Sequence, residues 1–395
     1  MKKRSRTKNK KYRTVKDVDF KGKRVLMRVD VNVPLDRKGN VRDHQRIVQI
    51  LPTINYILYK GAKQLILVSH HGRPHGTYDR RQSLQGVWRH FRDELAYDCH
   101  FVPDCISYSI PKKKLVLLEN LRFHPGEEQN NQRFAKKLAS YADIYVNDAF
   151  GSYQGHASIV DIPKYRPSFA GFLFQNELDA LNFKNVKKPF VFLLGGDKAS
   201  TKLPLIKKLS KKADKILVGG VLIFYFLKAM GYEIGRSKFN PEYVHLAKKL
   251  LKQKNIILPV DLVLAKKPSQ GAKTRVAGIK DIKLDEMGLD IGPKTVKKYK
   301  GILSKAKTVV WNGPMGLYEV EKFAKNTDAL ANHLATIKGK VISGGGDSIT
   351  VINKLGIYND LDYVSTGGGA TLKYIEKGTL PALEALKENA KRFTK

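Results

Sequence analysis

The residues of the first half of the chain that could do chemistry are cations and polar groups placed where expected β-strands end. Guanidinium groups make forked hydrogen bonds to phosphates and carboxylates, while carboxylate and amide oxygens accept hydrogen bonds from hydroxyl groups. Taken alone, each of these residues could have a purely structural role: Arg46 could be a cation on a helix surface, and His70 could be a histidine in a loop. At successive strand ends they together predict a pocket for a small, anionic, hydroxylated molecule. The set is Asp30, Asn32, Arg46, His70, Arg73 and Arg122.

The second half of the chain contains glycine clusters, most of them directly after an apolar or β-branched run. Glycine lets backbone N–H groups approach an anion closely, so repeated strand-to-glycine junctions indicate a phosphate cradle, with a nucleotide as the expected guest. The alternative is that they are strand-end turns of an ordinary α/β protein, because neither the P-loop nor the dinucleotide-binding glycine pattern is present. The clusters are Gly195-Gly196, Gly219-Gly220, Gly313 with Gly316, Gly344 to Gly346, and Gly367 to Gly369.

Charged residues follow two of these clusters. Lys198 and Lys202 come after the first, and Asp347 with Ser348 comes after the fourth. A lysine pair supplies point charges to phosphates, and an aspartate at a helix N-terminus beside glycines can hold a Mg²⁺ ion that is already bound to a nucleotide. These residues therefore predict phosphoryl transfer.

Length and composition limit the class of protein. The chain has 395 residues, of which 42% are hydrophobic, so about two globular domains are expected. No apolar run approaches the roughly 20 residues of a membrane-spanning helix, and the N-terminus lacks the apolar core of a secretory signal. We therefore expect a cytoplasmic protein with no membrane partner. Cys99 and Cys105 are the only cysteines, and with no second pair to complete a zinc site we expect ordinary reduced thiols.

The chain is strongly basic. Its formal net charge is +37, and residues 2–13 include basic side chains but no acidic one. Such a field attracts phosphates of every kind, from small metabolites to RNA, so nonspecific RNA contact is one expectation. The alternative is that the lysine-rich composition does not serve to bind any partner. The arm at 1–13 is expected to be disordered and solvated.

Strand-like and helix-like segments alternate along the chain, which predicts an α/β fold of parallel sheets covered by helices, with ligands at the carboxyl ends of the strands. The expected helices are 46–59, 203–209, 243–252 and 294–305. The expected strands are 24–29, 64–69, 115–118, 144–146, 191–194, 215–218, 261–264, 308–311, 341–343 and 363–365.

We expect two Rossmann-like lobes joined by an interdomain helix. The N-terminal substrate domain is expected at 1–168, and the nucleotide-binding domain at 169–379, beginning with the helical run 172–181. The segment 380–395, with its amphipathic stretch, is expected to pack back on the first domain. A helix that joins two domains would transmit their relative motion.

In order along the chain, these segments resemble phosphoglycerate kinases from about Asp17 to Leu386. So many specific runs in the same order identify the chain as a member of that family. The runs are RVLMRVDVNVP (24–34), SHHGRP (69–74), LLENLRF (117–123), VNDAFG (146–151), LLGGDKASTK (193–202), GLDIGPKT (288–295), VVWNGPMGLYE (309–319), ISGGGDS (342–348) and VSTGGGATL (364–372).

The resemblance implies a monomeric, two-lobed enzyme of glycolysis and gluconeogenesis. It would transfer a phosphoryl group reversibly between 1,3-bisphosphoglycerate and ADP, giving 3-phosphoglycerate and MgATP. The substrate positions map to the set named first, with Gln154 added. The catalytic positions map to Arg46, Lys198, Gly368 and Gly369, with Asp347 at magnesium and Glu319 at the ribose. The nucleotide positions map to Gly195, Gly196, Lys198, Lys202, Gly219, Gly288, Asn312, Glu319, Gly345, Gly346, Asp347 and Ser348.

The chain departs from the family's pattern at three places. The segment 151–158 reads GSYQGHAS, one residue shorter than usual and without the usual arginine, for which Gln154 is the nearest stand-in. Thr201 replaces an aspartate between the paired lysines, and Val221 fills a position that is often glycine in the adenine pocket. Three readings remain: an active kinase, a ligand-binding member with reduced activity, and a basic nucleic-acid-binding protein on the same scaffold. Both catalytic cations are present, which favours the first.

Overall fold

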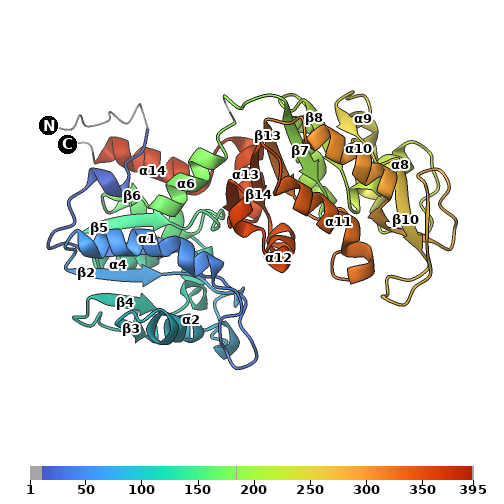
Figure 1. Cartoon of the computed structure of the whole chain (residues 1–395). Helices are drawn as coiled ribbons and strands as arrows, with labels where there is room; N and C mark the ends of the chain where they lie inside the picture. The colour runs from blue at the N-terminus through green and yellow to red at the C-terminus, as the bar shows by residue number, and fades with distance from the viewer. Residues whose placement is uncertain (1–10, 184, 394–395) are drawn as a thin grey trace. The chain divides into compact units, whose positions relative to one another are not determined.

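The computed structural model describes residues 11–183 and 185–393 and divides into two units (Figure 1). The first unit runs to Asp179 and resumes at Lys377, and the second runs from Ala180 to Glu376. We expected the boundary at residue 169, ahead of helix α6 (Phe172–Ala180); the structure groups this helix with the first unit almost to its last residue. Residues 1–10 of the expected basic arm lie outside the described residues.

The first unit is built on a six-stranded parallel sheet with the strand order β3-β4-β2-β1-β5-β6. Alternate residues of a central strand face opposite sides: Leu65 packs in the core that includes residues of α1, and Ile66 packs in the core that includes residues of α4. Burial on both faces explains the nearly continuous apolar runs of these strands. The strands are β1 (Arg24–Val29), β2 (Gln64–Val68), β3 (Cys99–Val102), β4 (Leu115–Leu118), β5 (Ile144–Asp148) and β6 (Ser168–Ala170).

Helices cover the sheet of the first unit. The longest, α1, buries Ile47, Ile50, Ile54 and Ile57, which recur at the three- and four-residue spacing of one helix face. Besides α6, the helices of this unit are α1 (Gln45–Tyr59), α2 (Gln85–Arg89), α3 (Pro125–Glu128), α4 (Gln132–Ser140), α5 (Ala157–Val160) and α14 (Pro381–Arg392).

The last helix, α14, packs against the edge of the first unit's own sheet. The side chain of Asn389 accepts hydrogen bonds from the backbone N–H of Ser168, at 2.8 Å, and from the Arg13 guanidinium, at 2.7 Å. Its Nδ2 donates to the carbonyl of Arg166 at 2.8 Å. One buried amide thus ties both ends of the described chain to strand β6. None of the described helices combines the length and the apolar character needed to cross a bilayer.

The second unit contains another six-stranded parallel sheet, with the order β15-β14-β13-β7-β8-β9. Its strands are β7 (Phe190–Leu194), β8 (Lys215–Val218), β9 (Ile256–Ile257), β13 (Thr308–Asn312), β14 (Lys340–Gly344) and β15 (Tyr363–Ser365). Its helices are α7 (Ala199–Leu209), α8 (Leu222–Ala229), α9 (Val244–Leu250), α10 (Pro293–Leu303), α11 (Glu321–Leu334), α12 (Gly346–Leu355) and α13 (Gly369–Lys377).

A small antiparallel sheet in the second unit differs from the parallel arrangement expected for segment 261–264. Strands β11 (Thr274–Gly278) and β12 (Met287–Ile291) flank β10 (Asp261–Ala265) in the order β11-β10-β12. The physical reason is the connection: β10 turns directly into β11 without a crossover helix, and a parallel pair would need one. The two α/β sheets themselves confirm the expected fold class.

Candidate functional site

A buried ion pair anchors the polar cluster of the first unit. Arg46, in the first turn of α1, donates from Nη1 to Oδ1 of Asp30 at 2.9 Å, and Asp30 follows the end of β1. The same carboxyl oxygen accepts from the backbone N–H of Asn32 at 3.2 Å. Burial alone would raise the pKa of Asp30, but the charges of Arg46, His70 and Arg28 outweigh it and lower the pKa. The carboxylate is therefore charged and holds Arg46 at the strand end.

Arg28 is a buried member of this cluster that the sequence analysis did not predict. It lies inside β1 and is only 1% exposed, because its guanidinium turns toward the strand end and contacts Nδ1 of His70 at 3.1 Å. Its Nε donates to Oγ of Ser158 at 2.8 Å, and that hydroxyl donates to the buried Glu127 at 2.6 Å. Burial, and then Arg28, lower the pKa of His70 well below its usual range. His70 is therefore neutral at physiological pH.

The remaining cations of the cluster face the same region. Arg122 donates from Nη1 to the carbonyl of Gly72 at 2.7 Å, and Gly72 donates its N–H to Oδ1 of Asn32 at 3.1 Å. Burial and the neighbouring cations Arg28 and Arg73 lower the pKa of Arg122, and together they outweigh the carboxylates of Glu128, 3.4 Å from Nε, and of Glu127. Cations this close repel one another, so the arrangement favours a bound anion that neutralises them.

Gln154 lies half-buried in the loop between β5 and α5, two residues before His156. Burial lowers the pKa of His156, and Glu127, Arg122 and Arg28 are among the charges that act on it. The loop that carries Gln154 therefore borders the cationic cluster.

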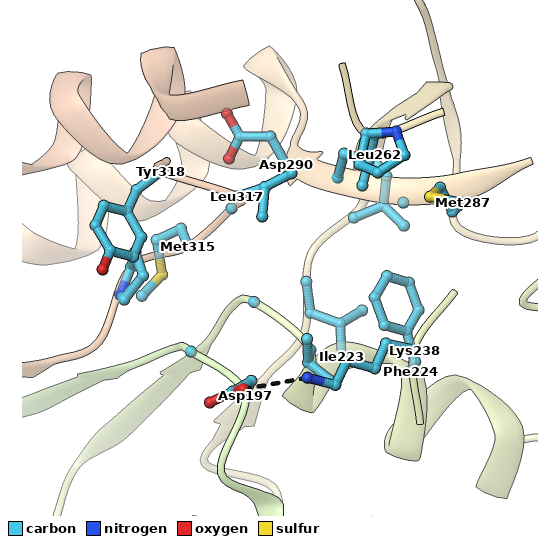
Figure 2. Close-up of a pocket in the computed structure, with 18 of the residues that line it drawn as sticks. Asp197, Ile223, Phe224, Lys238, Leu262, Met287, Asp290, Met315, Leu317 and Tyr318 are labelled. Atoms are coloured by element: carbon cyan, nitrogen blue, oxygen red, sulfur yellow. Dashed lines mark hydrogen bonds and ion pairs between the residues drawn. The ribbon is translucent and has the colours of Figure 1, made fainter. Parts of the chain in front are cut away.

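The second unit contains a cavity of about 510 Å³ (Figure 2). It is lined by residues of β10 and β12 and by segments that follow strands of the parallel sheet. The apolar part of its lining includes Phe224, Met287 and Leu317, and the polar part includes Lys198 and Asp347. Gly288 lets the Phe224 ring pack directly against β12, since a Cβ there would lie 2.7 Å from that ring. An apolar slot beside charged groups suits a base joined to phosphates.

The residues predicted to bind the nucleotide fall into two groups, those that line this cavity and those that do not. Those that line it are Gly196, Lys198, Gly288, Glu319 and Asp347. The others are not among its lining residues. They are Gly195, Lys202, Gly219, Asn312, Gly345, Gly346 and Ser348, together with Gly368 and Gly369, which stand at the start of α13.

Several residues of the second group hold the strand-end loops together. Lys202 is buried, and its ammonium donates to the carbonyl of Gly195; burial lowers the pKa of this lysine to about 8. Ser348 accepts at Oγ from the N–H of Gly313 at 2.7 Å, and Asn312 donates to the carbonyl of Gly344. These hydrogen bonds fix the shape of the loops before a nucleotide binds.

Close packing requires two of the predicted glycines. A Cβ on Gly195 would lie 1.9 Å from the carbonyl oxygen of Pro314, and a Cβ on Gly219 would lie 2.2 Å from Sδ of Met315. The loop after β13 therefore approaches the ends of β7 and β8 as closely as glycine permits.

The sequence analysis did not predict five of the charged or hydroxyl-bearing side chains that line the cavity: Asp197, Arg236, Lys238, Asp290 and Tyr318. Lys238 pairs with Asp197 at 3.2 Å, as Figure 2 shows, and Tyr318 donates to Asp347 at 3.3 Å. Burial raises the pKa of Asp290 to about 8. The run GLDIGPKT contains Asp290, but nothing local to Arg236 or Lys238 indicates a site.

The polar side of the cavity fits a magnesium ion carried by a nucleotide. Asp347 at the start of α12 and Asp197 after β7 both line it and offer carboxylate oxygens, the donors that Mg²⁺ prefers. Of the two departures in this unit, Val221 lines the cavity, whereas Thr201 is exposed and donates from its hydroxyl to the carbonyl of Lys198 at 3.1 Å.

Comparisons with known proteins agree with this geometry. A family model described as phosphoglycerate kinase matches residues 15–378. The phosphoglycerate kinase of Pseudothermotoga lettingae is 44% identical over 395 residues, with 96% of this chain and 99% of that protein covered. The cytosolic phosphoglycerate kinase of Triticum aestivum is 43% identical, with 95% and 98% covered.

Solved structures give the same result. The phosphoglycerate kinase from Coxiella burnetii matches this fold with a TM-score of 0.86 at 35% identity, covering 96% of this chain and 100% of that one. That from Pyrococcus horikoshii matches with a TM-score of 0.85 at 29% identity, with the same shares covered. The resemblance found in the sequence is confirmed, and the chain belongs to the phosphoglycerate kinase family.

Proposed function

We propose that the chain transfers a phosphoryl group reversibly between 1,3-bisphosphoglycerate and ADP, giving 3-phosphoglycerate and ATP as a step of glycolysis and gluconeogenesis. The observation that carries the proposal is the presence of two chemically different sites on a chain of this family: a cationic cluster in the first unit and a cavity with one apolar and one charged side in the second. The acceptor is a carboxylate, so the enzyme is a phosphotransferase with a carboxyl acceptor.

In this proposal the first unit binds the phosphoglycerate. Arg46, Arg73 and Arg122 neutralise its phosphate and carboxylate, while Asp30 and Asn32 accept from its hydroxyl. Neutral His70 can accept or donate one hydrogen bond without adding charge. The repulsion among the arginines supports this assignment, because an anion relieves it.

The second unit binds the nucleotide. The base would lie along the apolar wall, Glu319 would accept from the ribose, and Lys198 would meet the phosphates. Magnesium, held by Asp347 with Asp197 in reach, would supply charge neutralisation on the phosphate oxygens.

Catalysis in this proposal is positioning and charge stabilisation. The transferred group carries its charge on three equatorial oxygens in a loose transition state, so no protein nucleophile is needed. Arg46 and Lys198 stabilise that charge, and the N–H groups of Gly368 and Gly369 at the start of α13 add donors.

The test is a coupled assay of ATP-dependent phosphorylation of 3-phosphoglycerate on the wild type and the variants Arg46→Ala and Lys198→Ala. One cationic contact to the migrating group contributes about 10³-fold or more, so each variant should lose at least that much turnover with its circular dichroism unchanged. Matched controls are Arg24→Ala and Lys215→Ala, exposed cations at the opposite, amino ends of β1 and β8, which should keep wild-type turnover. Near-normal turnover in Arg46→Ala or Lys198→Ala would refute the assigned roles.

The same assay separates the active kinase from a ligand-binding member weakened near Gln154, since the latter would bind 3-phosphoglycerate but turn over little. We also propose that the chain works as a cytoplasmic monomer, because each site is built within one chain; a dimer mass in solution would contradict this. The net charge of +37 supports a nonspecific RNA contact in addition. RNA retention that does not fall steeply with salt would rule out that contact.

A further inference from the structure

A cluster of metal-binding side chain types lies in the first unit, among residues to which the proposed reaction gives no role. Asp104 and Cys105 follow β3, and His124 follows the short helical turn Leu121–Phe123. Their ligand atoms lie within 4.8 Å of one another. Nε2 of His124 is 2.8 Å from Oδ2 of Asp104, and the thiol of Cys105 is buried beside them.

A buried phenol next to the cluster has no hydrogen-bond partner. Tyr141 is 9% exposed, and its Oη is among the buried polar atoms that find no donor or acceptor in the described structure. Tyr141 and Cys105 pack in the same hydrophobic core of this unit. Burial, and then the charges of Cys105 and Asp104, raise the pKa of Tyr141 to about 12, so the phenol lies near the cluster. Buried hydroxyl groups are rarely left without a partner, so an additional polar group at this position would satisfy it.

The arrangement needs only small shifts to close on an ion. Two ligands of a tetrahedral zinc ion, each at about 2.0–2.1 Å from it, lie about 3.3 Å apart. The His124 and Asp104 atoms, which are hydrogen-bonded at 2.8 Å, would therefore have to move apart to admit the ion. The other oxygen of Asp104 accepts from the N–H groups of Ile106 and Ser107, both at 2.7 Å. Such bonds orient a ligating carboxylate.

The types of donor atom in the cluster favour one metal, and the cluster is open to solvent. Imidazole nitrogen, thiolate sulfur and carboxylate oxygen together favour zinc, whereas magnesium and calcium require oxygen ligands. The side chains of His124 and Asp104 are 23% and 24% exposed, so solvent reaches the cluster from one side while the sulfur stays buried. Cysteine spacing could not indicate such a site, because the fold brings its partners from another segment.

We propose that Asp104, Cys105 and His124 bind a zinc ion, with a water as the fourth ligand that is hydrogen-bonded to Oη of Tyr141. On binding, the Cys105 sulfur exchanges its proton for a bond to zinc, and the proton leaves to solvent. The His124 imidazole takes the tautomer with its proton on Nδ1, so that Nε2 turns from Asp104 to the metal with its lone pair free, and Asp104 ligates through the oxygen that Nε2 releases.

The test is titration of the full chain with Co²⁺ as a probe for zinc, under a reductant that contains no thiol. The bound ion should give the near-ultraviolet thiolate-to-cobalt band and the intense visible bands of four-coordinate cobalt, and added Zn²⁺ should remove them. Cys105→Ser should abolish the thiolate band. Cys99→Ser, which changes the other buried cysteine, should keep it, and both variants should retain kinase turnover.

The role of Tyr141, which would bond the zinc-bound water, is tested separately. Tyr141→Phe should keep the thiolate band but weaken Zn²⁺ binding by about 10- to 100-fold, the usual effect of losing a group that bonds a ligand. Saturating cobalt without a thiolate band, or a band that survives in Cys105→Ser, would overturn the site. Equal Zn²⁺ affinity in Tyr141→Phe would overturn the role of the phenol.

Discussion

In the first unit the orientation of one buried arginine depends on groups that no ligand needs to touch. Glu127 accepts from both the N–H and the hydroxyl of Ser158, and that hydroxyl accepts from Arg28. A charged group buried without such partners is strongly destabilising, so the serine and the carboxylate keep Arg28 pointed at His70 before any substrate arrives. An orientation set in advance reduces the ordering cost of binding.

The departure at Gln154 predicts weak binding of phosphoglycerate. A charge-assisted hydrogen bond contributes about 1.5–3 kcal/mol and a neutral one about 0.5–1.5 kcal/mol, so Gln154→Arg should lower the KM for 3-phosphoglycerate by about 5- to 10-fold. Turnover should change less, because glutamine leaves Arg46 and Lys198 in place. Steady-state kinetics with varied 3-phosphoglycerate measure both constants.

Gln154→Met is the matched control, since methionine has a similar length and no donor. It should raise the KM for 3-phosphoglycerate and leave the KM for ATP unchanged. If arginine at position 154 left the KM as it was, residue 154 would not face the substrate phosphate.

At this scale the sequence predicts which strand ends carry polar groups, but not where each side chain points. Asp30 and His70 could be placed in one pocket because each follows a parallel strand and the carboxyl ends of such strands share an edge. Arg28 sits inside an apolar strand, and only the distant Ser158 turns its guanidinium toward that edge. Lys202 faces inward for a similar reason, as its partner Gly195 precedes the helix that carries it.

Among the elements, α6 starts from a buried carboxyl group. Oδ1 of Asp148, at the end of β5, accepts from the N–H of Phe174 at 2.9 Å, and the carboxyl also bonds Leu173 and the hydroxyl of Thr53. Gly171 is required here because a Cβ would lie 2.2 Å from that oxygen. Burial nevertheless dominates and raises the pKa of Asp148 to about 7. The cap of α6 therefore titrates near physiological pH.

This cap predicts a specific pH dependence of stability. The native state keeps the Asp148 proton up to about pH 7, whereas the unfolded chain releases it near 3.8, so the free energy of unfolding falls as pH rises between these values. Each pKa unit corresponds to 1.36 kcal/mol, so the full loss is about 4 kcal/mol. Asp148→Asn removes the titration and should gain stability relative to the wild type as pH rises from 4.5 to 8, measured by urea unfolding at each pH.

Asp19→Asn is the control, since Asp19 is an exposed carboxylate in the same unit. Its stability should track the wild type at every pH. A constant difference between Asp148→Asn and the wild type across the range would mean that Asp148 is charged in the folded protein throughout.

The sequence predicts an element where the local pattern of apolar residues determines it. It predicts less where pairing with a distant segment determines the arrangement. The runs at 24–29 and 191–194 are strands with both faces buried, and each is joined to a parallel neighbour through a helix. The run at 261–264 looks the same locally, yet it pairs antiparallel, because its neighbour β11 returns without a helix. Strand direction is a property of the connection and not of the strand's own residues.

For the whole molecule, the proposed reaction requires the two units to approach each other. Reacting atoms must come within about 3–3.5 Å, and water must be excluded, while the two ligands are assigned to different units. The chain passes between the units at Asp179–Ala180 and Glu376–Lys377, at the ends of α6 and α13, so helix termini would absorb the change. Small-angle scattering should show a smaller radius of gyration with 3-phosphoglycerate and a non-hydrolysable ATP analogue together than with either alone. Arg46→Ala should compact less under the same ligands, and identical profiles with and without both ligands in the wild type would contradict closure.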